Sequence, residues 1–379
     1  MFERLSENIK EFFSQADMVL LTLCCVSSVF GIVLISSATR VSGSHRYIIV
    51  QSAALVLGFI FYFLFSTINI EEIVMAKWKL IALFNVVFIA GLLPFGTEHG
   101  GNRAWYDFWF LPVSIQPAEI VKITFILLLA YQLSLLKGPG LSSARSVAQY
   151  AGHMLFMIGL IYVISGDAGS CLVYVFVFLC MTFVAGVKPR WFALGAAAVI
   201  AGGAFIWKKG LLPSYMQKRF QVLFDHSYDP LGAGWHQTRG LIALGSGRWF
   251  GSGLFNGTQT QTGTLPERQT DFIFAVAGEE LGMVGCIAIM VLLTAIVIRC
   301  LVVARRTKND FSALICVGMA GMLVFQIIEN IGMCLFVMPV IGLTLPFFSY
   351  GGSSLITVFS AMGIVSGIKK RSRPSWLRT

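Results

Sequence analysis

The feature that most constrains this chain is a series of long apolar segments without charge. Met18–Thr39, Tyr47–Asn69 and Cys171–Val187 contain no Asp, Glu, Lys or Arg. A helix of roughly 18 to 20 such residues crosses the hydrocarbon core of a bilayer. Only 12% of the 379 residues are charged, against about 25% in a soluble domain. The sequence therefore predicts an all-α integral membrane protein.

We expect about ten transmembrane helices in a single polytopic membrane domain over residues 1–379. The expected spans are 18–38, 47–66, 78–96, 117–136, 149–164, 168–187, 191–208, 273–298, 311–336 and 350–368. All eight cysteines lie in or beside these apolar spans, without metal-ligand spacing. They are expected to pack helices and to form neither a disulfide nor a metal site.

Lys and Arg in the short loops predict the orientation. Counted from a cytoplasmic N terminus, one side carries seventeen Lys and Arg, and the short loops of the other side carry only Arg40, Arg46 and Arg103. Positive charge accumulates on the cytoplasmic side, so both termini are expected there. The net charge of +10 then reflects membrane topology, and no nucleic acid is expected as a partner.

A loop of about sixty residues, 209–272, joins the seventh and eighth helices on the extracytoplasmic side. Trp235, Trp249 and its many glycines argue against disorder. With Lys208 it carries seven cations, which form either a solvated surface or a site for an anionic ligand. We favour the anionic ligand. The cations are Lys208, Lys209, Lys218, Arg219, Arg239, Arg248 and Arg268.

Ionisable residues inside a bilayer are expensive and face a partner or a cavity. Glu119 and Lys122 are three residues apart on one helix face, which predicts an ion pair and leaves ligand contact open. Asp167, between the fifth and sixth helices, is either a helix cap or a site residue. Glu279 and Glu280 must turn inward or find a partner, and Glu329 with Asn330 is expected to bond a neighbouring helix.

Two motifs lie where polar loops meet the membrane. Thr264–Asp271 reads TLPERQTD before the apolar start of the eighth helix. Asp271 suits an N-cap of that helix, but a cap does not explain Glu267 or Arg268. Pro339–Ser354 reads PVIGLTLPFFSYGGSS, and non-helical backbone at membrane depth lines a cavity or is buried in protein. Together they predict a polar cavity with a cationic rim.

These strings resemble the SEDS (RodA/FtsW-like) family of shape, elongation, division and sporulation proteins over nearly the whole chain. The most specific are LPERQTDFIFAVAGEELGMVG over 265–285 and GLTLPFFSYGGSS over 342–354. SIQPAEIVK over 114–122 and DPLGAGWHQTRGLIALGSG over 229–247 are weaker matches. The family's ten-helix topology agrees with the hydropathy pattern.

The resemblance implies a peptidoglycan glycosyltransferase at the outer face of a bacterial cytoplasmic membrane, acting in cell elongation or division. Its substrate would be lipid II, an undecaprenyl-pyrophosphate-linked disaccharide peptide, and its partner a class B penicillin-binding protein. The family's essential acidic residue corresponds to Asp271, and its Glu–Lys pair to Glu119 and Lys122.

Three strings depart from the family's patterns. Residues 102–105, NRAW, carry one residue more than the usual Arg-Trp pair, and residues 165–170, SGDAGS, lack the usual Gln-Pro. The QS pair that often follows the DPLG string is Gln237-Thr238 here. Assignment to the RodA or the FtsW branch therefore stays open.

The chemistry of this reaction narrows the roles. A departing pyrophosphate needs positive charge, and the acceptor hydroxyl needs a carboxylate or a metal to remove its proton. Asp271 is expected as general base or metal ligand; no cofactor is certain, and a divalent cation (Mg²⁺ or Mn²⁺) remains open. A single displacement inverts the anomeric carbon. Expected substrate contacts are Arg103, Glu119, Lys122, Asp167, Lys218, Arg219, Gln237, Arg239, Glu267, Arg268, Ser349, Gly351, Gly352 and Ser353.

Two other functions fit the same features. A lipid II flippase would have the same cavity and cationic rim, and a non-catalytic scaffold for a penicillin-binding protein would need only the helices. The long outer loop and the acid at its exit favour the enzyme.

Overall fold

In the computed structural model, the described part of the chain contains ten helices that are long enough and apolar enough to cross a membrane. The structure describes residues 16–99, 102–107, 113–136, 138, 140–210, 214–225, 232 and 234–372. The ten spans are α2 (Met18–Ala38), α3 (Arg46–Thr67), α4 with α5 (Ile70–Ala90 and Leu92–Phe95), α6 (Pro117–Leu135), α7 (Ala144–Ser165), α8 (Ala168–Ala185), α9 (Pro189–Lys208), α13 (Ile273–Arg306), α14 (Asp310–Cys334) and α15 (Gly352–Ser372). The predicted all-α fold is confirmed.

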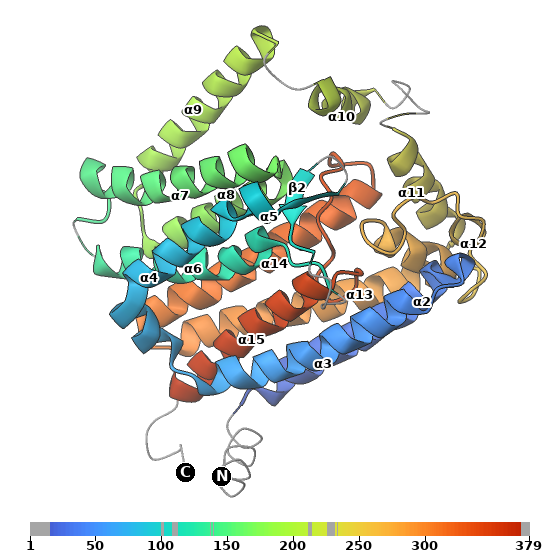
Figure 1. Cartoon of the computed structure of the whole chain (residues 1–379), viewed down its shortest axis with the longest axis horizontal. Helices are drawn as coiled ribbons and strands as arrows, with labels where there is room; N and C mark the ends of the chain where they lie inside the picture. The colour runs from blue at the N-terminus through green and yellow to red at the C-terminus, as the bar shows by residue number, and fades with distance from the viewer. Residues whose placement is uncertain are drawn as a thin grey trace, which may run out of the picture.

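The inner helices of the bundle are α6, α14 and α15, which are largely buried. The helix α14 packs against α13, α8 and α6, and α15 packs along α3 (Figure 1). By contrast, α9 has no buried residue, and in Figure 1 it leans away from the other helices. The eight cysteines are all free.

Some expected boundaries were wrong, because charged residues that we placed outside the membrane find partners. The third span was expected at 78–96 but begins at Ile70 and kinks at Lys77. Within it, Glu71 is buried against Arg371, with 2.6 Å between Nη2 and Oε2, and accepts a hydrogen bond from Ser312. The fifth span starts earlier than expected, at Ala144, and the eighth runs on to Arg306.

The start of the first span and the end of the last lie at the same end of the bundle. Asp17 is buried and pairs with Arg299 of α13 at 2.8 Å and Lys369 of α15 at 3.0 Å. Its main-chain oxygen also accepts a hydrogen bond from Tyr62 of α3. An even number of spans requires this arrangement.

The opposite end carries the shorter elements. They are η1 (Arg40–Ser42), β1 (Thr97–His99), β2 (Asn102–Trp105), α10 (Ser214–Phe224), α11 (Trp235–Ser246) and α12 (Thr258–Gln261). β1 and β2 form an antiparallel hairpin. The helices α11 and α12 pack on α13 and lie together at the right of Figure 1. The described parts of the long loop are thus largely folded against the bundle.

Candidate active site

The main chain leading into α13 is held from two directions at Asp271. The carbonyl oxygens of residues 269–271 each accept a hydrogen bond. Tyr350 N–H donates to the first at 2.8 Å, Ser349 Oγ to the second at 2.6 Å and Asn330 Nδ2 to the third at 2.9 Å. The segment before α15 and the helix α14 thereby fix the position of Asp271.

The side chain of Asp271 does not cap α13. The N-cap of that helix is Phe272, which makes no side-chain cap hydrogen bond. The interpretation of Asp271 as only a helix cap is therefore wrong, because the helix starts one residue later than a cap at 271 requires. Gly342 lies beside the carboxylate, where an added Cβ would be 3.6 Å from Oδ2.

The surroundings of Asp271 favour proton uptake. The pKa of its carboxyl is raised to about 7, first by burial and then by the negative charge of Glu267, while the positive charge of Arg219 lowers it. A carboxylate with a pKa near the working pH is well matched to general base catalysis.

The residues before Asp271 form a tight turn. Glu267 has a left-handed φ of 43°, and its main-chain oxygen accepts from Phe272 N–H at 3.2 Å. Its carboxylate accepts from Thr270 Oγ1 at 3.0 Å. Arg268 Nε donates to the main-chain oxygen of Ala38, at the end of α2. Arg268 thus fastens this turn to α2, and its expected contact with pyrophosphate stays a prediction.

The expected ion pair on α6 is present. Lys122 Nζ lies 2.6 Å from Glu119 Oε1, and both side chains are buried. The second oxygen of Glu119 has no hydrogen-bond partner among the described residues. A ligand or water can therefore still bond to this carboxylate.

Asp167 is the N-cap of α8, as one of its two interpretations predicted. It accepts hydrogen bonds from Ser170 N–H at 2.9 Å and Ser170 Oγ at 2.7 Å. It also accepts from Gln116 Nε2 at 2.8 Å, at the start of α6. The cap thus joins α8 to α6, and a contact between Asp167 and substrate stays a prediction.

Three other residues that we expected to contact substrate make contacts within the protein. Gln237 is buried and donates to the main-chain oxygen of Met338 at 2.7 Å. The guanidinium of Arg239 stacks on Trp235 at 4.1 Å, and Arg103 Nε donates to the Gly96 oxygen at 3.0 Å.

The glycine- and serine-rich segment that leads into α15 makes close contacts at Gly351, Gly352 and Ser353. Gly351 N–H donates to Gln51 Oε1 at 3.1 Å, and Ser353 Oγ accepts from Gln116 N–H at 3.4 Å. At Gly352 an added Cβ would lie 2.6 Å from Val113, so this close contact requires glycine. Lys218 and Arg219 lie on α10; Arg219 interacts electrostatically with Asp271.

Glu279 and Glu280, which needed partners, hold the long loop against α13. Glu279 accepts from the N–H groups of Gln259 and Thr260 at 2.6 and 2.9 Å. Glu280 accepts from Ser37 Oγ at 2.7 Å. Sequence reasoning found these acids but not their partners, because those lie far along the chain, in the loop for Glu279 and in α2 for Glu280.

Glu329 and Asn330, neighbours on α14, differ in their hydrogen bonding. Asn330 bonds the Asp271 and Leu343 carbonyl oxygens, which lie in the segments before α13 and before α15 and not in a neighbouring helix as expected. Neither oxygen of the buried Glu329 carboxyl has a hydrogen-bond partner among the described residues, so for Glu329 the prediction was wrong.

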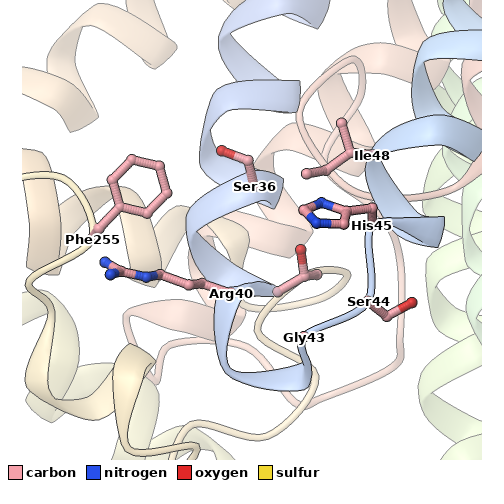
Figure 2. Close-up of a pocket in the computed structure, with 8 residues that line it drawn as sticks. Ser36, Arg40, Gly43, Ser44, His45, Ile48 and Phe255 are labelled. Carbon is pink, nitrogen blue, oxygen red and sulfur yellow. The ribbon is translucent and has the colours of Figure 1, made fainter.

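A cavity of about 590 Å³ lies at the same end of the bundle, between α2, α3 and the loop (Figure 2). Its lining residues are Ser36, Thr39, Arg40, Gly43, Ser44, His45, Ile48 and Phe255.

In the described part of the chain, no three His, Cys, Asp or Glu side chains gather to hold a metal. A divalent cation at Asp271 stays a prediction.

Comparison with known proteins gives consistent matches. The profile of the FtsW/RodA/SpoVE family, described as "Cell cycle protein", matches residues 15–374. The peptidoglycan glycosyltransferase MrdB of Escherichia coli (strain K12) is 35% identical over 75% of each chain. The probable peptidoglycan glycosyltransferase FtsW of Halomonas elongata is 30% identical, over 99% of this chain and 98% of that protein. Stage V sporulation protein E of Bacillus subtilis is 31% identical, over 94% of this chain and 98% of that protein.

Solved structures agree with these relatives. A chain of a peptidoglycan synthase complex, solved to explain how polymerization and crosslinking are coordinated, superposes with a TM-score of 0.79. It is 30% identical and covers 94% of this chain and 98% of its own. The crystal structure of the Thermus thermophilus rod shape determining protein RodA gives a TM-score of 0.70 at 28% identity. The match covers 95% of this chain and 98% of that one.

Proposed function

Since the chain belongs to the FtsW/RodA/SpoVE family, we propose that it polymerises lipid II into glycan strands, with Asp271 as the general base. It is a multi-pass membrane protein and a peptidoglycan glycosyltransferase, like its relatives. The observation that carries the role of Asp271 is a carboxylate fixed by its main chain, unused as a cap, with a pKa of about 7.

In the proposed step, the acceptor sugar hydroxyl attacks the anomeric carbon of the donor sugar. The O–H bond of the acceptor breaks and its proton passes to Asp271, while a new C–O bond forms at the anomeric carbon. The bond from that carbon to the pyrophosphate oxygen breaks, and lipid pyrophosphate leaves with the electron pair. One displacement inverts the anomeric carbon.

Positive charge on the long loop would stabilise the departing pyrophosphate. Arg219 is the best supported candidate, because it interacts electrostatically with Asp271. Lys122 is neutralised by Glu119, so we assign this pair to orienting the substrate and not to neutralising the leaving group. A divalent cation, where bound, would add Lewis acidity at the pyrophosphate oxygens.

We propose that the active site faces away from the cytoplasm and that the crosslinking partner is a class B penicillin-binding protein. The structural relative belongs to a complex that couples polymerization to crosslinking, which supports such a partner. The seventeen-to-three distribution of loop cations supports the orientation. The relatives named glycosyltransferases do not favour the flippase or scaffold interpretations.

The deciding experiment uses purified full-length protein in lipid vesicles supplied with lipid II. We expect glycan strands, resolved by gel electrophoresis, from this protein without another polymerase. A chelator, followed by Mg²⁺ or Mn²⁺, tests whether a cation is needed. Lipid II that crosses the bilayer without forming strands would contradict the proposal and support a flippase.

A further inference from the structure

The cavity between α2 and α3, here called the α2–α3 pocket, has a mostly apolar lining that also carries Arg40 and the imidazole of His45, which the proposed reaction does not use. Figure 2 shows Arg40 reaching from the end of α2 toward the ring of Phe255, with His45 on its other side. Hydroxyl groups of Ser36 and Ser44 complete the polar wall. Among the described residues that line the pocket there is no Asp or Glu.

Arg40 is available to a ligand. Its guanidinium carbon lies 5.5 Å from the centre of the Phe255 ring, and among the described residues it forms no salt bridge. Phe255 holds a left-handed φ of 66°, which is uncommon and costly for a bulky residue.

The two helix ends at the pocket also favour an anion. The last carbonyl groups of α2 are occupied, because Arg268 bonds the Ala38 oxygen and Gln261 the Ser37 oxygen. The negative end of that helix dipole is thus largely compensated. At the start of α3, His45 makes no side-chain cap, and the N terminus of this 22-residue helix carries partial positive charge.

An apolar track leads into the pocket. Val29 and Val33 of α2 are exposed, and they lie seven and three residues before Ser36 on one face of the helix. Val19 and Val26 continue the exposed stripe toward the other end of α2. In a membrane-spanning helix this face meets hydrocarbon chains. A ligand can therefore place a chain on α2 and its polar group in the pocket.

We propose that the α2–α3 pocket binds the phosphate group of a membrane lipid, with the Arg40 guanidinium as the donor to its oxygens. The lipid's hydrocarbon chain lies along the exposed valines of α2. The volume of about 590 Å³ suits a small polar headgroup. Both a glycerophospholipid and a polyprenyl phosphate offer this chemistry. The site does not depend on the proposed polymerase activity.

Native mass spectrometry of the full chain in detergent tests the site with three lipids. Phosphatidylglycerol and undecaprenyl phosphate carry the phosphate, and diacylglycerol lacks it. We expect both phosphates to bind more tightly than diacylglycerol, and the tighter of the two identifies the source. Diacylglycerol binding as well as the phosphates would overturn the proposal.

Variants then locate the binding. Arg40→Gln removes one charged contact to phosphate, which weakens binding about tenfold. The matched control is Arg46→Gln, an exposed arginine at the start of α3 that does not line the pocket and is expected to leave binding unchanged. Phe255→Ala, which removes the ring beside Arg40, is expected to weaken binding as well. Equal loss in the Arg40 and Arg46 variants would mean a general charge effect and no site.

Discussion

At the scale of single residues, Asp271 combines a fixed main chain with a side chain that makes no cap. Its carbonyl oxygen is bonded by Asn330, and Glu267 and Arg219 act on its carboxyl through charge. Burial costs the ionised form, so this carboxylate is kept at the edge of protonation. Such a cost is typical of functional sites.

Asp271→Asn is the sharpest test of this assignment. Asn keeps the size and the main-chain bonds but cannot accept the proton, and loss of a general base typically costs about 10² to 10⁴ in rate. We expect normal membrane abundance and no detectable glycan strands in the vesicle assay. Glu267→Gln is the control, with a smaller expected loss, because Glu267 raises the pKa of Asp271 but is not the residue that takes the proton. Robust polymer from Asp271→Asn would exclude the general base role.

The raised pKa of Asp271 also predicts a pH dependence. Polymerisation should fall as the pH drops below about 7, because the base becomes protonated. Folding stability changes in the opposite direction. A carboxyl whose folded pKa lies above its unfolded value of 3.8 stabilises the fold at low pH, and this is lost as the pH rises toward 7. The melting temperature of Asp271→Asn minus that of wild type should therefore be larger at pH 8 than at pH 4. The same difference in melting temperature at both pH values would contradict the raised pKa.

At the scale of elements, the loop before α13 is built into a break in that helix. Gly282 has φ 68° and ψ −163° inside α13, a conformation that essentially only glycine adopts. The N–H groups of Met283 and Val284 bond the loop carbonyls of Arg248 and Trp249. This insertion, with Glu279 and Glu280, positions the loop that continues to Asp271.

Gly282→Ala should loosen this insertion. An added Cβ would lie 2.4 Å from Gly251 N, and the backbone strain alone costs about 1–3 kcal/mol. We expect a lower melting temperature in detergent and faster proteolysis of the loop. The control is Gly202→Ala in α9, where an added Cβ meets nothing within 4 Å. Equal stability of the two variants would show that the insertion contributes little.

The ion pair of α6 makes a second prediction at this scale. Lys122→Met leaves Glu119 buried and unpaired, and breaking a buried pair costs about 3–5 kcal/mol. The double variant Glu119→Leu/Lys122→Met removes both charges and should recover much of the stability. Thermal unfolding in detergent measures both. A double variant as unstable as the single one would show that packing, and not charge, sets the cost.

At the scale of the whole molecule, the ends of the bundle have different tasks. One end joins helices through the buried Asp17 with Arg299 and Lys369. The other carries Asp271, the long loop and the α2–α3 pocket. They are separated by the length of α2, whose 21 residues span about 30 Å. The proposed chemistry is thus confined to one side of the membrane.

Cysteine labelling tests which side this is. In a variant without native cysteines, a membrane-impermeant reagent applied to intact cells should modify Gly257→Cys in the loop. It should not reach Arg306→Cys at the other end of α13 until the cells are opened. The reverse pattern would invert the topology and place Asp271 in the cytoplasm.

The sequence by itself determined the spans and the most specific motifs, because membrane insertion depends on continuous apolar length and local charge. Hydropathy predicted ten helices, and spacing predicted the pair of Glu119 with Lys122. Some predicted boundaries were wrong, as at the start of the third span at Ile70. There the charged residue Glu71, which we had placed outside the membrane, is buried against a distant partner, Arg371.

Only the tertiary structure decided the partners of residues far apart in the chain. A local pattern allowed Asp271 to be a cap, but in the folded chain the N-cap of α13 is Phe272, and bonds from Asn330 and Ser349 hold the main chain before it. Glu280 needed Ser37, which lies 243 positions away. Hydropathy fixes which segments enter the membrane, but hydrogen bonds between polar atoms require an angle and a distance that only the packed helices set.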